Sequence, residues 1–153
     1  MTLYRDENGN LESDDFIPRL ATDEDLIQRW KQANNQLKAL PVEPKNIATD
    51  LAMMIVMCAA QLGKRGYTTT GDESDWVIDT VPFVYYCIRK IKSDFKTPFR
   101  IEASQNHIDA LKESDDWQRA YEGAETKNDF VGVWAGIQVQ LVDRADYLIV
   151  RAY

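Results

Sequence analysis

Residues 130 to 153, FVGVWAGIQVQLVDRADYLIVRAY, decide the fold that this chain is expected to adopt. Apolar and polar residues alternate from Ile137 to Leu141, as they do in a strand with one buried and one solvated face. The polar segment 143–146 indicates a turn, and the β-branched and aromatic residues from Tyr147 to Tyr153 indicate a further strand. We therefore expect paired β-strands that run to the last residue of the sequence.

The sequence before residue 63 indicates two helices. Thr22 followed by Asp25 resembles a capping box with Asp in the place of Glu, and it predicts a helix start. A second helix is predicted from about Lys45 to Leu62, with Gly63 as its cap. Its segment LAMMIVMCAAQL is apolar on nearly every side, so it should be the most buried element or lie at a subunit interface. The apolar positions of the first helix follow one another at helical spacing: Leu26, Trp30, Ala33, Leu37 and Leu40.

Residues 72 to 91 allow two interpretations. The acidic residues of 72–75 favour the start of a third helix, which Pro82 would then kink. Alternatively, Trp76 to Val81 is a short strand, and a helix follows with Thr80 as its cap and Pro82 in its first turn. Of the two, we favour the kinked helix.

A strand from Phe99 to Ala103 and a fourth helix are predicted after residue 97. Ser104 or Asn106 would cap this helix, which would carry Ile108, Leu111 and Trp117. The order strand, helix, strand, strand is typical of an α+β protein. We expect N-terminal helices, about four helices in all, packed on a small and mainly antiparallel C-terminal sheet.

The composition favours one folded domain. With 153 residues, 44% of them hydrophobic, the chain can bury one sizeable core. Residues 1 to 25 hold eight acidic residues against Arg5 and Arg19. We therefore expect an acidic, largely irregular arm at residues 1–21, followed by a single α+β domain at residues 22–153.

The net charge of −7 bears on partners and location. It favours solubility and argues against nucleic acid as the main partner and against an anionic membrane surface. The sequence has no apolar run of the ~18 residues that a spanning helix needs, and its first residues are acidic where a signal peptide is basic and then apolar. We expect a cytoplasmic protein. Cys58 and Cys87 lie in apolar segments, so we interpret both as buried hydrophobic residues rather than as a disulfide or metal pair.

Few residues point to catalysis. His107 is the one histidine and lies near a helix start, so a His-based zinc site or a Ser-His-Asp triad lacks support. We interpret it as a surface or capping histidine rather than as a general base. The segment 63–75, GKRGYTTTGDESD, holds glycines and a Lys-Arg pair without the spacing of a phosphate-binding loop, and we interpret it as a helix cap and an exposed turn.

Clusters of acidic residues could bind magnesium or carry out acid–base chemistry. Most of them fall at predicted helix starts or turns, where acids are favoured by the helix dipole. We therefore predict no catalytic residue, no metal site and no cofactor. The clusters are Asp14 and Asp15, Asp23 to Asp25, Asp72 to Asp75, and Asp115 and Asp116.

Residues 98 to 153 resemble a known family. PFRIEASQNHIDALKESDDWQRAY followed by NDFVGVWAGIQVQL is similar to the closing portion of tailed-phage major capsid proteins, in which a strand, a helix and a glycine-punctuated strand follow one another. Gly132, Gly136, Ile137 and Val139 stand at the matching positions. The first 97 residues depart from the pattern, because they have neither a long extended arm nor room for the shell scaffold. The resemblance implies a connector, completion or tail protein, present in the host cytoplasm and the virion, and no functional residue is carried over from it.

We therefore expect a non-enzymatic assembly protein that acts through protein–protein contacts and self-associates or joins a larger assembly. The alternatives are an acidic inhibitor or immunity-type protein that binds a basic partner, and a carboxylate-dependent enzyme. Aromatic residues are enriched at binding hot spots, although a sheet core would explain the same aromatics, and a solvated helix end would explain the same cations. The predicted partner-binding residues are Trp134, Tyr147, Tyr153, Arg89, Lys90, Lys92, Lys96 and Arg100.

Overall fold

The computed structural model describes residues 3–40, 45–70, 75–119 and 129–153. They form two compact units, Met1–Ile78 and Asp79–Tyr153, and each is described by itself below. The described part of the chain has four α-helices and mainly antiparallel sheets, which confirms the predicted α+β class. The prediction of a single domain at residues 22–153 stays a prediction.

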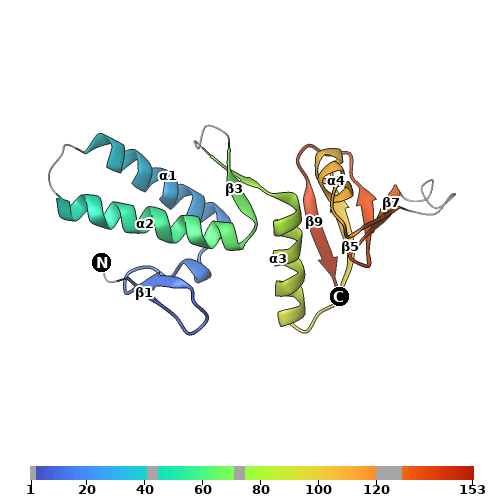
Figure 1. Cartoon of the computed structure of the whole chain (residues 1–153), viewed down its shortest axis with the longest axis horizontal. Helices are drawn as coiled ribbons and strands as arrows, with labels where there is room; N and C mark the ends of the chain where they lie inside the picture. The colour runs from blue at the N-terminus through green and yellow to red at the C-terminus, as the bar shows by residue number, and fades with distance from the viewer. Residues whose placement is uncertain (1–2, 41–44, 71–74, 120–128) are drawn as a thin grey trace. The chain divides into compact units, whose positions relative to one another are not determined.

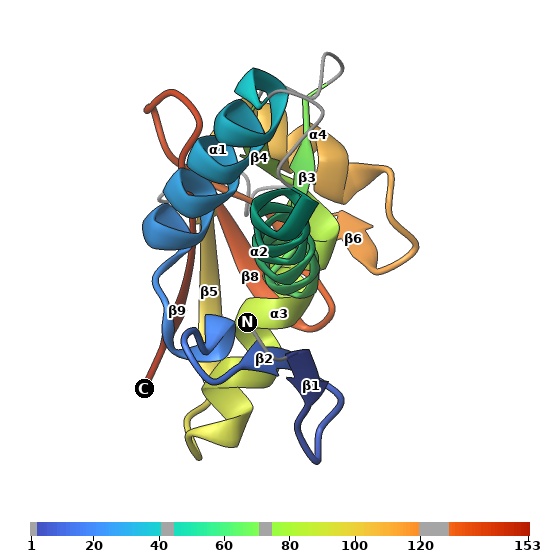
Figure 2. The same cartoon turned by 90° about the vertical axis from the view of Figure 1, so that its left-hand side faces the viewer.

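Two helices that lie side by side form most of the first unit (Figures 1 and 2). They are α1 (Asp23–Ala39) and α2 (Lys45–Lys64). The hydroxyl of Thr22 accepts a hydrogen bond of 3.1 Å from the backbone N–H of Asp25, as the capping box predicted. The buried core of the unit comes from both helices and from the segment before them: Phe16, Leu26, Trp30, Met57, Cys58 and Leu62.

Helix α2 differs from its prediction in two respects. It continues through Gly63 to Lys64, and Gly66 takes the left-handed conformation, with φ of 82°, that was expected at the cap. It is also buried on one side only, because Met57, Cys58 and Leu62 face the core while Val56 stays 53% exposed. One side of this apolar helix is therefore exposed, and of the two predictions for it the role at a subunit interface stays a prediction.

Residues 3–20 form ordered structure where the sequence predicted a largely irregular arm. Strands β1 (Leu3–Arg5) and β2 (Leu11–Ser13) pair antiparallel, and a 3-10 helix, η1 (Pro18–Leu20), follows. The carboxylate of Asp6 closes the hairpin by accepting hydrogen bonds from the backbone N–H groups of Asn8 (2.9 Å) and Asn10 (2.8 Å). These local side-chain contacts and the burial of Phe16 fix a segment that has no periodic pattern of its own.

A second hairpin lies where the sequence predicted the first part of a kinked third helix, so that prediction was wrong. Strand β3 (Tyr67–Thr69) pairs antiparallel with β4 (Trp76–Ile78), and helix α3 begins only at Thr80 and ends at Ser93. The indole of Trp76 packs edge-to-face on that of Trp30, with ring centroids 5.5 Å apart. Pro82 falls in the first helical turn, where its missing N–H costs nothing. Residues 71–74 of the loop lie outside the described residues, and of its acidic cluster only Asp75 is described.

The second unit holds a five-stranded sheet in the order β6-β7-β8-β5-β9. Helices α3 and α4 (Gln105–Lys112) contact each other and β5. Strands β5 and β8 are parallel, and the other neighbours are antiparallel. The strands are β5 (Pro98–Ala103), β6 (Trp117–Arg119), β7 (Phe130–Trp134), β8 (Ile137–Leu141) and β9 (Leu148–Ala152).

Two expectations for this sheet were wrong. The consecutive strands β8 and β9 do not pair with each other, because β5 lies between them and pairs with both. Trp117 lies on β6 rather than on the fourth helix, which ends at Lys112. Its register partner is Trp134 of β7, a residue that the local sequence around Trp117 does not reveal.

Candidate functional site

The turn that follows α3 places an aromatic side chain in an unusual conformation. The N–H of Lys96 donates to the carbonyl of Ile91 (3.1 Å) and the N–H of Phe95 donates to that of Lys92 (3.0 Å), which is the hydrogen-bond pattern of a Schellman motif. Phe95 occupies the left-handed position of this motif with φ of 59°. Glycine usually occupies it, since a side chain there costs roughly 1–2 kcal/mol.

Burial of the Phe95 side chain does not offset this strain. Its side chain is 99% exposed, so no apolar surface is removed from water. A residue that is both strained and exposed is explained more readily by binding than by stability.

The segment that follows this turn lies beside Tyr153, the residue after β9. The backbone N–H and carbonyl groups of Thr97 and Tyr153 exchange hydrogen bonds of 2.9 and 3.1 Å. The rings of Phe99 and Tyr153 stack with centroids 5.0 Å apart, and Tyr153 stays 77% exposed. In Figures 1 and 2 the end of the chain accordingly lies next to the loop that leaves α3. Tyr153, which is distant in the sequence, thus lies beside the segment that carries Phe95 and Phe99.

Basic residues lie close to Phe95 in the sequence. Lys92 and Lys96 are exposed and flank Phe95, and the exposed Arg89 and Lys90 precede them on the last turns of α3. Among the described residues none of these four forms an ion pair, so their charge is available to a partner. We call this site the Phe95 surface, and it consists of Lys92, Phe95, Lys96, Phe99 and Tyr153.

The structure brings together most, but not all, of the predicted partner-binding residues. Tyr153 and the basic residues of 89–96 lie on or beside the Phe95 surface. Arg100 lies at its border, with its guanidinium 5.4 Å from the Phe99 ring centroid, and it also pairs with Glu102 at 2.9 Å. Phe95 itself was missed. An aromatic residue directly after a basic helix end, where glycine is expected, was the signal that could have found it.

Trp134 and Tyr147 lie elsewhere. Trp134 is fully buried, donates from Nε1 to the Ser114 hydroxyl at 3.1 Å, and packs against the Tyr85 ring at a centroid distance of 4.8 Å. It belongs to the sheet core, which corrects its interpretation as an exposed anchor. Tyr147 is half-buried, and its backbone N–H donates to the Ser104 hydroxyl at 3.1 Å.

His107 is buried, which corrects its interpretation as a surface or capping histidine. Its Nδ1 lies 2.7 Å from the Thr80 hydroxyl, and its Nε2 lies 2.8 Å from Oδ1 of Asp146. A neutral ring would carry its proton on Nε2, so that Thr80 donates to Nδ1. Both ring nitrogens of His107 have hydrogen-bond partners, and Thr80 is also buried. His107 therefore links the starts of α3 and α4 to the turn before β9. We therefore interpret it as structural.

The acidic residues at the end of the first β-hairpin border a hollow. It has a volume of about 360 Å³, and its apolar lining comes from Phe16, Ile17, Leu20 and Ala21, with Leu20 69% exposed. Asp14, Asp15 and Asp25 complete the lining, and we call this site the acidic hollow. The described residues hold no group of His, Cys, Asp or Glu that could bind a metal ion.

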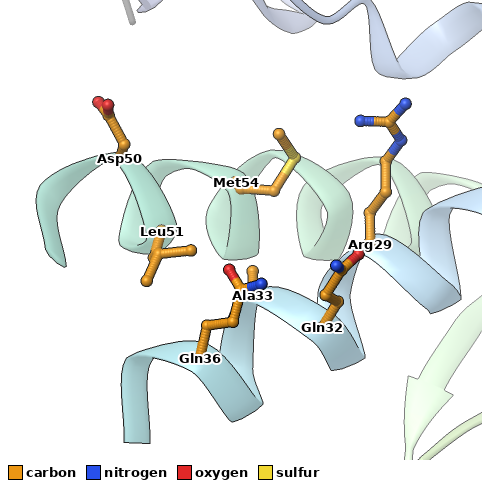
Figure 3. Close-up of a pocket in the computed structure, with 7 residues that line it drawn as sticks. All are labelled: Arg29, Gln32, Ala33, Gln36, Asp50, Leu51 and Met54. Atoms are coloured by element: carbon orange, nitrogen blue, oxygen red, sulfur yellow. The ribbon is translucent and has the colours of Figure 1, made fainter. Parts of the chain in front are cut away.

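A second pocket lies between α1 and α2. Figure 3 shows Arg29, Gln32 and Gln36 on α1 and Leu51 and Met54 on α2, all of which line it. Its volume is about 250 Å³. Arg29 is already engaged, because its Nε pairs with Asp25 at 3.0 Å and its guanidinium lies 4.4 Å from the Phe16 ring centroid. Arg29 and Asp50 are the charged residues of the lining, and amide and apolar side chains make the rest of it.

Cys58 is buried, and this burial raises the pKa of its thiol to about 12. Cys87 is half-buried.

Within the described ranges no helix is both long and apolar enough to cross a membrane. Comparisons with protein families, with curated proteins and with solved structures found no match to this chain.

Proposed function

We propose that this chain is a non-enzymatic assembly protein that binds another protein through the Phe95 surface. Phe95 carries the proposal, because it is an aromatic side chain held in a left-handed conformation and 99% exposed. Transferring its ring into a partner would remove apolar area from water, and aromatic residues dominate the energy of many interfaces. Lys92 and Lys96 would form the polar rim of such an interface.

The charge of the partner follows from the charge of the surface. Residues 89 to 100 contain five basic residues and one acidic residue, so an acidic protein segment complements them. Basic and aromatic residues also form platforms for single-stranded nucleic acid. The net charge of −7 on the whole chain opposes a polyanion, and we therefore favour a protein.

The resemblance of residues 98–153 supplies a biological setting for this proposal. It supports a role in the particle of a tailed phage, as a connector, completion or tail protein that moves from the host cytoplasm into the virion. Phe95 lies outside the resembling segment, so the binding proposal does not depend on this setting.

A photo-reactive phenylalanine analogue at position 95 tests the proposal in the full-length chain. Irradiation in the producing cells should give a protein adduct at position 95 and not at position 77, where Val77 is 41% exposed and serves as the control. Equal adducts at both positions would contradict the proposal. So would tight binding of a single-stranded oligonucleotide that Phe95→Ser abolishes, because nucleic acid would then be the partner.

A further inference from the structure

We propose that the protein bound by the Phe95 surface is a second copy of this chain, whose acidic hollow receives the Phe95 ring. The inference rests on the proposed function and names its partner. One copy would contribute its second unit and the next copy its first unit, so the contact is head-to-tail.

The apolar parts of the two sites are complementary. Phe95 projects from a turn with its whole side chain in water, whereas the acidic hollow offers about 360 Å³ lined by Phe16, Ile17, Leu20 and Ala21. Leu20 is 69% exposed at that hollow, so both partners would bury apolar surface on contact. The exposed apolar area on either side is then explained by the same event.

The charges of the two sites are complementary as well. Lys92 and Lys96 are exposed and lie within three residues of Phe95 in the sequence, and Asp14 and Asp15 are exposed at the hollow. Residues 1–78 carry 13 acidic and 8 basic residues, so the unit that offers the hollow is negative as a whole. Opposite potentials speed encounter and fix the orientation of docking, and salt weakens both effects.

The geometry of the contact sets the type of assembly. The two sites belong to different units and consist of different residues, so each copy keeps one free site after pairing, and a heterologous contact of this kind produces rings or filaments. One aromatic ring and a few charges bury less area than a standard interface, so each contact should be weak, with a Kd of about 1 μM or higher. Closure of the copies into a circular oligomer would strengthen the assembly.

Sedimentation velocity over a wide concentration range tests the inference. Wild-type protein should associate at high concentration and dissociate in high salt. Phe95→Ser should weaken association about tenfold or more. Val77→Ser and Lys38→Glu, which alter exposed residues outside both sites, should leave it unchanged. Circular dichroism would show that each variant is folded.

Charge reversal makes the test specific for the two sites. A chain with Lys92→Glu and Lys96→Glu should stay monomeric, and so should a chain with Asp14→Lys and Asp15→Lys, because each then has like charges at both sites. Mixing the two variants should restore association, since the altered surface of one matches the altered hollow of the other. Association that survives in either variant alone, or that mixing fails to restore, would overturn the inference.

The outcomes separate this inference from the proposed function. A monomeric wild-type chain whose position 95 cross-links to a different protein would overturn the second copy as partner and leave the binding role of the Phe95 surface intact. A position-95 adduct formed within one chain, at any dilution, would overturn both. A position-95 adduct on residues of the acidic hollow of another copy would support both.

Discussion

The Nδ1 atom of His107 lies 2.7 Å from the hydroxyl oxygen of Thr80, and both residues are buried. Thr80 begins α3 and His107 lies in the first turn of α4, so this hydrogen bond joins two helix starts. Asp146 holds the other ring nitrogen from the turn before β9, where its own φ is 52°. One histidine therefore fixes three segments of the second unit.

Thr80→Val should destabilise the protein by about 1–3 kcal/mol, because the variant keeps the side-chain shape and leaves the buried Nδ1 of His107 without a partner. Urea unfolding followed by tryptophan fluorescence measures the change. Thr68→Val, at an exposed position of β3, is the matched control and should shift stability by no more than about 0.5 kcal/mol. Equal effects of the two substitutions would show that the hydrogen bond does not contribute to the free energy of unfolding.

Glu102 should make the stability depend on pH. Its carboxylate accepts hydrogen bonds from Arg151 at 3.0 Å and from Arg100 at 2.9 Å, and these bonds, that of Arg151 foremost, hold the pKa of Glu102 below its usual value. A lowered pKa stabilises the folded state above the unfolded pKa, and this stabilisation is lost as the pH falls through the folded pKa.

Glu102→Gln should therefore cost about 1 kcal/mol at neutral pH, a value kept small because both arginines are partly exposed. The difference from wild type should shrink as the pH falls below the usual carboxyl range. Urea unfolding at a series of pH values measures it, with Glu113→Gln at an exposed position as the control. A difference that does not change with pH would rule out this ionisation as its source.

Gly132→Ala should cost about 1–3 kcal/mol through overpacking. A Cβ atom at this position would lie 2.4 Å from the Trp117 ring and 2.9 Å from the carbonyl oxygen of Gln118. Gly63→Ala is the contrasting control, because a Cβ there meets no atom within 4 Å and alanine favours the helix, so stability should rise by up to about 1 kcal/mol. Thermal unfolding distinguishes the two, and a Gly132→Ala variant as stable as wild type would contradict the close packing of Trp117.

Cys58 should resist alkylation in the native protein. Its thiol is buried and its pKa is raised to about 12, so almost no thiolate forms near pH 8. Iodoacetamide should modify the half-buried Cys87 well before Cys58, and peptide mass spectrometry measures both rates. In urea the two rates should become similar. Equally fast modification of Cys58 without denaturant would be the contrary result.

Only part of the candidate site could be predicted from the sequence. The basic residues of 89–96 and Tyr153 could be named in advance because a cluster of charge and a terminal aromatic are visible in the sequence. Phe95 was not named, because only the Schellman hydrogen bonds show that it occupies a position suited to glycine. For Trp134 the sequence left a partner-binding role and a place in the sheet core open, because the pattern of its strand does not show that Tyr85 and Ser114 cover it.

The α+β class, the capping of α1 by Thr22 and the alternation of β8 could be predicted from local sequence, because capping and periodicity depend on residues a few positions apart. Tertiary structure alone decided that β5 lies between β8 and β9, and that Thr97 meets Tyr153. Strand pairing joins residues that are distant in the chain, and many registers satisfy the same local pattern. Only the packing of the whole sheet selects one of them.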